Sequence, residues 1–189
     1  ILVHQAVAAD FETRLAKAVR ALVVGPGVEP GVVQGPLISE PAVEKVEAHI
    51  ADALGKGGRL VTGGHRHALG PLFFEPTVIG DCTPAMAIAH EETFGPVAAL
   101  FPFADEAEAI ALANDTEVGL AGYFYTRDLA RAWRVAEALE VGMVGINTGL
   151  ISTEVAPFGG VKESGLGREG SRHGIEDYTE LKYLCVAGL

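Results

Sequence analysis

The chain has few of the residues that build disulfide frameworks, metal sites or membrane spans. Of its 189 residues only two are cysteines, Cys82 and Cys185, which lie far apart and follow no metal-binding spacing. This scarcity excludes a disulfide-stabilised scaffold and favours a reducing, cytoplasmic compartment. No apolar run approaches the roughly 20 residues that a transmembrane helix needs, so we do not expect a membrane-spanning protein.

Positive charge is also scarce. The chain has 14 lysines and arginines against 25 aspartates and glutamates, and its formal net charge is −11. This balance is unfavourable for binding nucleic acid or an anionic membrane, so neither is expected as a partner. Among the six histidines, His65 and His67 form a pair in a glycine-rich turn but lack a third ligand. We therefore expect no metal site.

What the sequence does contain is an alternation of predicted strands and helices. Hydrophobic residues make up 49% of the chain, enough for a sizeable core. Strands are expected at residues 1–3, 60–62, within 73–79, 97–103, 119–126, 144–147 and 179–186, and helices at 10–23, 39–56, 105–114 and 129–139. The strand within 73–79 is expected to be interrupted at Pro76. The alternation predicts an α/β fold with a mostly parallel, twisted sheet flanked by helices. We expect a main domain over residues 1–170 and a tail with a closing strand over 171–189.

The first residues have neither an initiator methionine nor a signal-peptide pattern. They read Ile1-Leu2-Val3-His4-Gln5, a β-rich opening without any lead-in. This start predicts a strand that belongs to a longer polypeptide.

Residues 157–169 form the most informative segment. They read Pro-Phe-Gly-Gly-Val-Lys-Glu-Ser-Gly-Leu-Gly-Arg-Glu and contain four glycines. Glycine permits positive φ and close backbone approach, so this composition predicts an elaborate loop, which is typical of a functional segment. Phosphate binding at Gly165 to Gly170 is not expected, because a phosphate-binding loop follows a strand and opens a helix, whereas this stretch follows another loop.

This loop resembles the signature of the aldehyde dehydrogenase family, and further motifs of that family occur in the expected order. They are Gln34-Gly35-Pro36, Phe74-Glu75-Pro76-Thr77-Val78, Glu91-Glu92-Thr93-Phe94-Gly95-Pro96-Val97, and Asn114-Asp115-Thr116 with Gly119-Leu120. Residues 146–158 and 180–185 are similar to the succinate-semialdehyde dehydrogenase subgroup. The resemblance implies oxidation of an aldehyde with NAD or NADP, and a homo-oligomer that uses the C-terminal strand for association. The choice between the two cofactors stays open. The substrate could also be an aldehyde other than succinate semialdehyde.

The resemblance also implies that part of the catalytic machinery lies outside this chain. In the family, the nucleophilic cysteine, the general-base glutamate and the Rossmann-type domain precede the position of Ile1. The chain is therefore expected to be a C-terminal portion, inactive by itself. Neither cysteine of the chain is expected to be the nucleophile, because Cys82 follows an aspartate and Cys185 lies between apolar residues, where no cation lowers the thiol pKa.

Three residues are expected by resemblance to contact the cofactor. The carboxylate of Glu92 would accept hydrogen bonds from the nicotinamide-ribose hydroxyls, since it is an acceptor-only group with two oxygens. Phe94 would flank the nicotinamide, and Gln34 would touch a ribose. The alternatives are a solvated loop glutamate for Glu92 and core packing for Phe94.

Three residues of the second half are expected in the substrate and catalytic region. Ser152 would donate a hydrogen bond to the substrate, or would instead form a local turn bond. Phe158 would wall an aldehyde tunnel, or would pack in the core. Glu169 would relay protons as a catalytic residue, or would be the ion partner of Arg168 or Lys162.

A second hypothesis belongs to a different functional class. The chain could be a non-catalytic module that associates with itself through residues 179–186, because an unpaired terminal strand invites pairing with a neighbour. The two hypotheses are compatible with each other.

Overall fold

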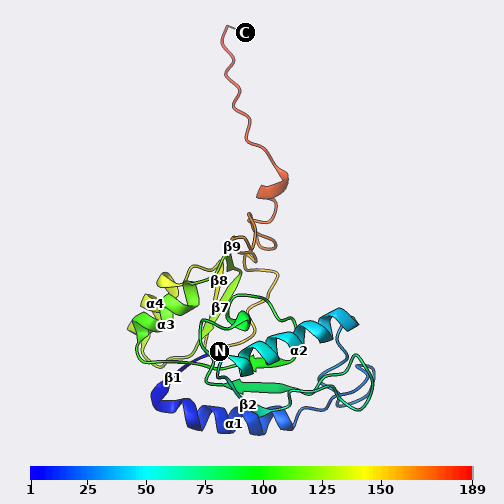
Figure 1. Ribbon diagram of the computed structural model, residues 1–189. Coiled ribbons are helices and arrows are strands. Elements are labelled where there is room, and N and C mark those ends of the chain that lie inside the picture. Colours follow the sequence, from blue (N-terminus) through cyan, green and yellow to red (C-terminus); the bar gives the residue numbers. More distant parts are fainter. Residues whose placement is uncertain (189) are drawn as a thin grey trace. The chain divides into compact units, whose positions relative to one another are not determined.

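A computed structural model describes residues 1–188 of the chain, which divides into two compact units, residues 1–109 and residues 110–189 (Figure 1). Both units combine helices with short strands, so the predicted α/β class is confirmed. No helix among residues 1–188 is both long and apolar enough to cross a membrane.

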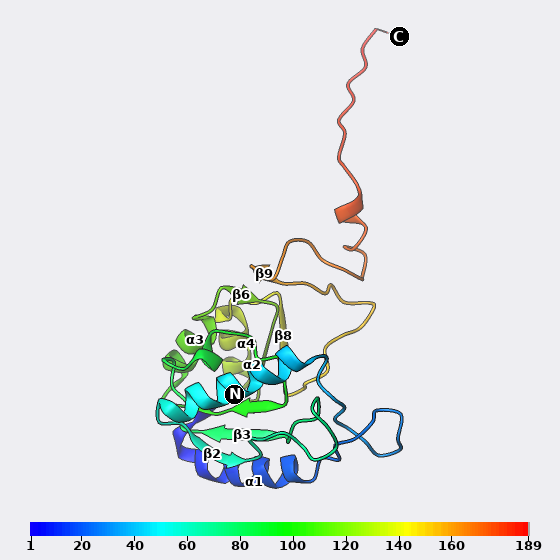
Figure 2. The same cartoon turned by 45° about the vertical axis from the view of Figure 1, so that its right-hand side comes forward.

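The first unit has a three-stranded sheet between two helices. The strand order is β2 (Arg59–Thr62), β3 (Thr77–Gly80), β4 (Val97–Ala99), with β3 antiparallel to β2 and parallel to β4. Helix α1 (Ala8–Arg20) covers one face of this sheet, and helix α2 (Glu40–Gly55) covers the other (Figures 1 and 2). This arrangement gives the unit a packed layer on each side of the sheet.

The two packed layers meet at the central strand β3. Successive strand residues point to opposite faces, so Val78 and Ile79, both fully buried, belong to different clusters. Val78 packs with Val3 and Leu100 on the α1 side. Ile79 packs on the α2 side, in a larger cluster with Val43, Val46, Ile50, Ala53, Phe74, Cys82, Met86 and Ala99.

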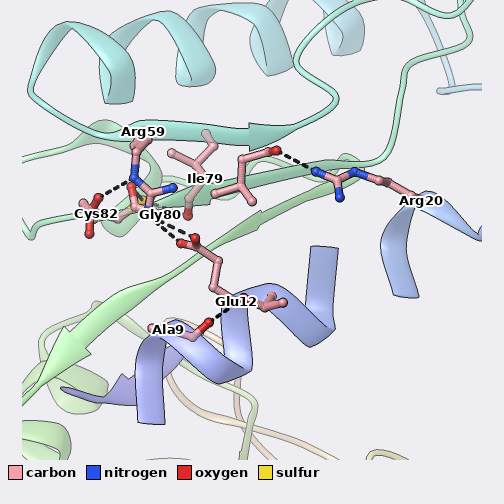
Figure 3. Close-up of polar contacts among 10 residues, drawn as sticks. Ala9, Glu12, Arg20, Arg59, Ile79, Gly80 and Cys82 are labelled. Carbon is pink, nitrogen blue, oxygen red and sulfur yellow. Dashed lines mark hydrogen bonds and ion pairs between the residues drawn. The ribbon is translucent and has the colours of Figure 1, made fainter. Parts of the chain in front are cut away.

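Helix α1 is also fixed to the sheet by polar contacts (Figure 3). Arg59 on β2 donates to both carboxylate oxygens of Glu12, the shorter contact measuring 2.9 Å, and to Asp81 at 2.9 Å. Arg20 donates to the Thr62 hydroxyl and to the Val61 carbonyl, each at 3.1 Å. These contacts fix the first half and the last residue of α1 against β2.

The predicted strand 97–103 proves to be two strands in different sheets. Strand β5 (Phe101–Phe103) pairs in parallel with β1 (Leu2–His4), whereas β4 pairs with β3. The break falls at Leu100, whose amide donates to the Ile79 carbonyl at 2.9 Å. The predicted interruption at Pro76 within residues 73–79 is confirmed, because β3 begins directly after it, at Thr77, and Phe74 forms only an isolated bridge with Arg66.

Short helical elements complete the first unit and lead out of it. The 3-10 turn η1 (Gln5–Val7) precedes α1, and a second one, η2 (Ala87–Ala89), precedes the loop that leads to β4. Helix α3 (Glu106–Asn114) begins with the expected Asp105 cap, and the Glu108 carboxylate binds the amide one residue before that cap. Asp105 accepts from the Glu108 amide at 3.0 Å, and the Glu108 carboxylate accepts from the Ala104 amide at 2.7 Å.

The second unit is built around a β-α-β arrangement. Strand β7 (Ala121–Phe124) pairs in parallel with β8 (Met143–Ile146), and helix α4 (Leu129–Ala138) connects them. A short antiparallel pair joins β6 (Val118–Gly119) to β9 (Val161–Lys162), a strand that the sequence did not predict. The pairing of β9 anchors the middle of the glycine-rich loop.

The predicted closing strand at residues 179–186 is not present in the described structure. After the 3-10 turn η3 (Glu176–Tyr178), residues 179–188 run as an exposed segment without helix or strand (Figure 1). A strand requires a hydrogen-bonded neighbour, and no segment of residues 1–188 pairs with this one. The predicted domain boundary near residue 170 stays a prediction.

Candidate functional site

The first unit contains an open cavity of about 390 Å³ beside strand β4. One wall is the segment 91–95, which we call the Glu92 loop, and the other walls come from β4, Phe101, Ile88 and Ile1. Two of the residues predicted to contact a cofactor, Glu92 and Phe94, line it. The structure therefore brings these two predicted residues to one cavity.

Glu92 and Phe94 both present their side chains to solvent. Glu92 is exposed, and within residues 1–188 its carboxylate has neither a hydrogen bond nor an ion pair. Phe94 is 80% exposed and has a φ of +48°, in the left-handed region that non-glycine residues rarely adopt. An exposed aromatic ring excludes core packing for Phe94 within this unit, and the free carboxylate can accept two hydrogen bonds from a vicinal diol.

A buried histidine on α2 contacts both residues that flank Glu92. The imidazole Nδ1 of His49 lies 2.9 Å from the Thr93 hydroxyl, and its Nε2 lies 3.4 Å from the Glu91 carboxylate. His49 is 4% exposed, which makes it one of two buried polar residues in the described chain, with Thr77. Sequence reasoning did not single out His49 or Thr93.

The end of the Glu92 loop packs directly on α2 as well. A Cβ atom added to Gly95 would lie 2.4 Å from a methyl group of Val46, closer than real atoms approach. Gly95 is therefore required by the close contact between loop and helix.

Helix α2 also holds the segment that precedes this loop. The Asp52 carboxylate accepts from the Ala87 amide at 2.7 Å and pairs with Lys56 at 2.7 Å. The hydrogen bond from Lys56, followed by that from Ala87, holds the pKa of the Asp52 carboxyl below its ordinary value.

Gln34, the third predicted cofactor contact, lies outside this cavity. Its side-chain amide donates to the Phe74 carbonyl at 2.7 Å, and its backbone bridges to Val24. These contacts give Gln34 a structural role in the first unit, while its contact with a cofactor stays a prediction.

In the second unit, the structure places Phe158 directly opposite Glu169. Their backbones form an antiparallel bridge, with amide-to-carbonyl distances of 2.9 Å and 2.7 Å. Phe158 is partly buried and Glu169 is exposed. One predicted substrate residue and the predicted catalytic residue are thus neighbours, which their spacing of eleven positions did not reveal.

Arg168 and Lys162, the two cations considered as ion partners of Glu169, bind other groups. Arg168 donates from its side chain to the carbonyls of Gly160 and Gly167, at 2.8 Å and 2.6 Å. Lys162 donates to the carbonyls of Asn114 and Thr116 and pairs with Glu140 at 2.6 Å. The alternative in which Glu169 pairs with Arg168 or Lys162 is therefore not observed.

Ser152 lies apart from that bridge in the exposed segment after β8. Its hydroxyl makes no hydrogen bond within residues 1–188, so the alternative of a local turn bond is not observed, and its contact with a substrate stays a prediction. A second cavity, of about 540 Å³, lies beside α4 and is lined by Trp133, Leu129 and Ile146 among others. None of the predicted site residues lines it.

The two thiols differ in environment. Cys82 is 2% exposed and belongs to the core cluster around α2, and this burial raises the pKa of its thiol. Cys185 is exposed in the segment after η3. Within residues 1–188 no group of three or more His, Cys, Asp or Glu side chains is arranged to hold a metal ion.

Comparison with known proteins identifies the family to which these motifs belong. The model of the "Aldehyde dehydrogenase family" matches residues 1–184. The chain is 63% identical over 179 residues to the glutarate-semialdehyde dehydrogenase of Pseudomonas aeruginosa, covering 95% of this chain and 37% of that protein. It is 60% identical over 189 residues to the 3-sulfolactaldehyde dehydrogenase of Pseudomonas putida, covering 100% of this chain and 39% of that protein.

A solved structure agrees with the sequence relatives. The succinate-semialdehyde dehydrogenase from Burkholderia pseudomallei superposes with a TM-score of 0.96 at 66% identity, covering 99% of this chain and 39% of that one. The chain thus spans less than two fifths of the length of each of these relatives. The family match over residues 1–184, together with this identity, shows that the chain belongs to the aldehyde dehydrogenase family.

Proposed function

We propose that this chain is part of an enzyme that oxidises an aldehyde to the carboxylic acid with NAD or NADP. The observation that carries the proposal is the family match, which runs from residue 1 to residue 184. The relatives described above are all named as dehydrogenases of an aldehyde. The exposed carboxylate at the cavity in the first unit supports the same conclusion, since it suits a sugar diol.

The residues of the Glu92 loop are proposed to bind the nicotinamide end of the cofactor. When bound, the cofactor supplies a hydride acceptor for the aldehyde carbon. The Glu92 carboxylate would hold the ribose through its two hydroxyls, because it can accept both hydrogen bonds and has no competing partner among residues 1–188. Phe94 would present its exposed ring beside the nicotinamide. Neither residue distinguishes NAD from NADP.

The substrate is proposed to be a short aldehyde with an anionic group at its far end. Glutarate semialdehyde, succinate semialdehyde and 3-sulfolactaldehyde, the compounds named for the relatives, share this design with either a carboxylate or a sulfonate. Succinate semialdehyde is the first candidate, from the similarity at residues 146–158. Ser152 would donate its free hydroxyl to the substrate, and Phe158 would line the aldehyde path.

The attacking thiolate is proposed to come from polypeptide outside these residues. Attack on a carbonyl requires an accessible sulfur with a lowered pKa, whereas Cys82 is buried and its pKa is raised. We propose that the base and the Rossmann-type domain also lie there, in the part of the whole enzyme that this chain does not span. Glu169 is proposed to relay a proton at its exposed carboxylate.

An activity assay tests the proposal. The full-length protein that carries this sequence is mixed with NAD or NADP and one aldehyde, and reduction of the cofactor is followed by absorbance. Succinate semialdehyde, glutarate semialdehyde and 3-sulfolactaldehyde are compared with butanal, a neutral aldehyde. We expect kcat/KM for an anionic aldehyde to exceed that for butanal by roughly 100-fold, the value of a lost charged hydrogen bond. The absence of turnover with every aldehyde would contradict the proposal.

The isolated 189-residue chain separates the two functional classes. We propose that it produces no NADH or NADPH from any of these aldehydes, because it lacks an accessible activated thiolate. The second candidate, a self-associating module, is favoured by the exposed unpaired residues 179–188, which include Leu181, Tyr183, Leu184 and Val186. Dimers or larger assemblies of the isolated chain in light scattering would support that role, and a monomer at all micromolar concentrations would exclude it.

A further inference from the structure

One face of helix α2 is occupied by side chains that hold the segment before β4. Val46, His49, Asp52 and Lys56 are spaced by three or four residues, so they share this face. Lys56 donates to the Ala85 carbonyl at 2.7 Å, and Asp52 accepts from the Ala87 amide at 2.7 Å. His49 and Val46 then contact residues of the Glu92 loop itself.

His49 is the buried polar side chain on this face of α2. A buried polar group costs free energy unless it is hydrogen-bonded, and both ring nitrogens of His49 have a partner. The Glu91 carboxylate can only accept, so in the neutral ring Nε2 carries the proton and Nδ1 accepts from the Thr93 hydroxyl.

The two hydrogen bonds of His49 differ in strength. The 2.9 Å distance to Thr93 is that of an ordinary hydrogen bond, whereas the 3.4 Å distance to Glu91 is at the outer limit. The Glu91 side chain is also 63% exposed, so solvent weakens its contact. The bond to Thr93 is therefore the main polar link between helix and loop.

The link to Thr93 matters because the next residue has an unusual backbone. Phe94 has a φ of +48°, and such a conformation persists at a non-glycine residue only where its surroundings impose it. The residue before it is held by His49, and the residue after it, Gly95, is packed on Val46. Helix α2 thus constrains both neighbours of Phe94.

We infer that His49 is a positioning residue that fixes the orientation of Glu92 and Phe94 through Thr93. Glu92 has no hydrogen bond of its own within residues 1–188, so its direction is set by the residues on either side of it. This inference rests on the proposed function, because it gives the fixed orientation its purpose, which is to present the carboxylate to the cofactor ribose. His49 itself is not among the residues that line the cavity, so it would act on the cofactor only through the loop.

The test compares three substitutions in the full-length protein. His49→Leu removes both hydrogen bonds and keeps an apolar side chain of similar reach. His49→Asn places an amide near the position of Nδ1, so it can restore the bond to Thr93. Ile50→Val, at the neighbouring core residue on the same helix, is the control for a general loss of packing, because Ile50 belongs to a core cluster that includes no residue of the Glu92 loop.

Two measurements are made on each variant. The first is the steady-state KM for the cofactor together with kcat, and the second is the rate of amide hydrogen exchange in a peptide that covers residues 91–95. We expect His49→Leu to raise KM for the cofactor roughly tenfold, with a smaller change in kcat, because an ordered loop is lost rather than a reacting group. Exchange of the loop peptide should become faster by about the same factor.

The control variants decide the outcome. His49→Asn should return KM and loop exchange to within about threefold of the original protein, since one hydrogen bond is regained. Ile50→Val should alter neither. If His49→Leu gives the same KM and the same loop exchange as Ile50→Val, the inference is wrong. Should His49→Leu fail to fold, Thr93→Val removes the same bond from the loop side and must reproduce both effects.

Failure of this inference can be told apart from failure of the proposed function. A protein without dehydrogenase activity would contradict the proposed function, while loop exchange in His49→Leu would still show whether His49 holds residues 91–95. An active protein in which His49→Leu changes neither measurement would leave the proposed function standing and overturn the inference.

Discussion

The two units of the chain differ in how they support their candidate residues. In residues 1–109, apolar side chains are packed on both faces of a sheet, and every buried hydrophobic residue of the described chain lies at or before Leu100. In residues 110–188, large apolar side chains such as Leu129, Trp133 and Leu150 are more than half exposed. The Glu92 loop is therefore held by a packed helix, whereas Ser152 lies in an exposed segment.

Membership of one family therefore does not give every site residue the same local support. Glu92 and Phe94 owe their arrangement to contacts within one unit, and those contacts can be tested residue by residue. Phe158 and Glu169 are held by a backbone bridge and by Arg168, which spans the carbonyls of the glycine-rich loop. Ser152 has no comparable support within residues 1–188.

The largest expected effect is a contrast in thiol reactivity between the units. Cys185 is exposed, whereas Cys82 is buried and the pKa of its thiol is raised by burial. We expect Cys82 to react with an aromatic disulfide reagent at least about 100-fold more slowly than Cys185, because reaction requires local opening of the core. Release of the chromophore at neutral pH, with Cys82→Ala and Cys185→Ala as matched single-thiol variants, measures both rates.

Equal rates for the two thiols would contradict the packed core of the first unit. The same assay also tests whether residues 179–188 associate between copies of the chain. If these residues associate between copies of the chain, the reactivity of Cys185 should fall as protein concentration rises, while that of Cys82 should stay unchanged.

The next effect is a contrast in the cost of removing an aromatic side chain. Phe74 is 1% exposed in the core around α2, so Phe74→Ala should lower the free energy of unfolding by about 3–5 kcal/mol. Trp133 is 66% exposed on α4, and Trp133→Ala should change it by less than about 1 kcal/mol. Urea denaturation followed by circular dichroism gives both values. Similar losses for the two variants would show that the second unit is as tightly packed as the first.

The sequence was sufficient to predict the elements whose patterns are local. The apolar spacing of Val43, Val46 and Ile50 predicted α2, and the spacing of Asp105 and Glu108 predicted the cap of α3, which the structure confirms. Pairing between distant residues was harder to predict. The break at Leu100 and the strand β9 depend on hydrogen bonds to residues far away in the sequence, which no local pattern contains.

The same distinction applies to the candidate site. The motif around Glu92 pointed to two of the residues that line the cavity, Glu92 and Phe94, but the support of that loop by His49 was missed. A signal was present, because His49 lies three residues after Val46 on the apolar face of a predicted helix. A lone histidine on such a face is usually a satisfied core residue, and its partner Thr93 is 44 positions away.

The most direct test of the account is the affinity of the full-length protein for its cofactor when Glu92 is changed. Glu92→Gln keeps the shape of the side chain and removes its charge, and Glu44→Gln does the same on an exposed face of α2. We expect the Kd for NAD or NADP, measured by calorimetry, to rise roughly 10- to 100-fold for Glu92→Gln, the value of a hydrogen bond to a charged group. Glu44→Gln should leave it unchanged. The same Kd for both variants would contradict the claim that the Glu92 loop binds the cofactor.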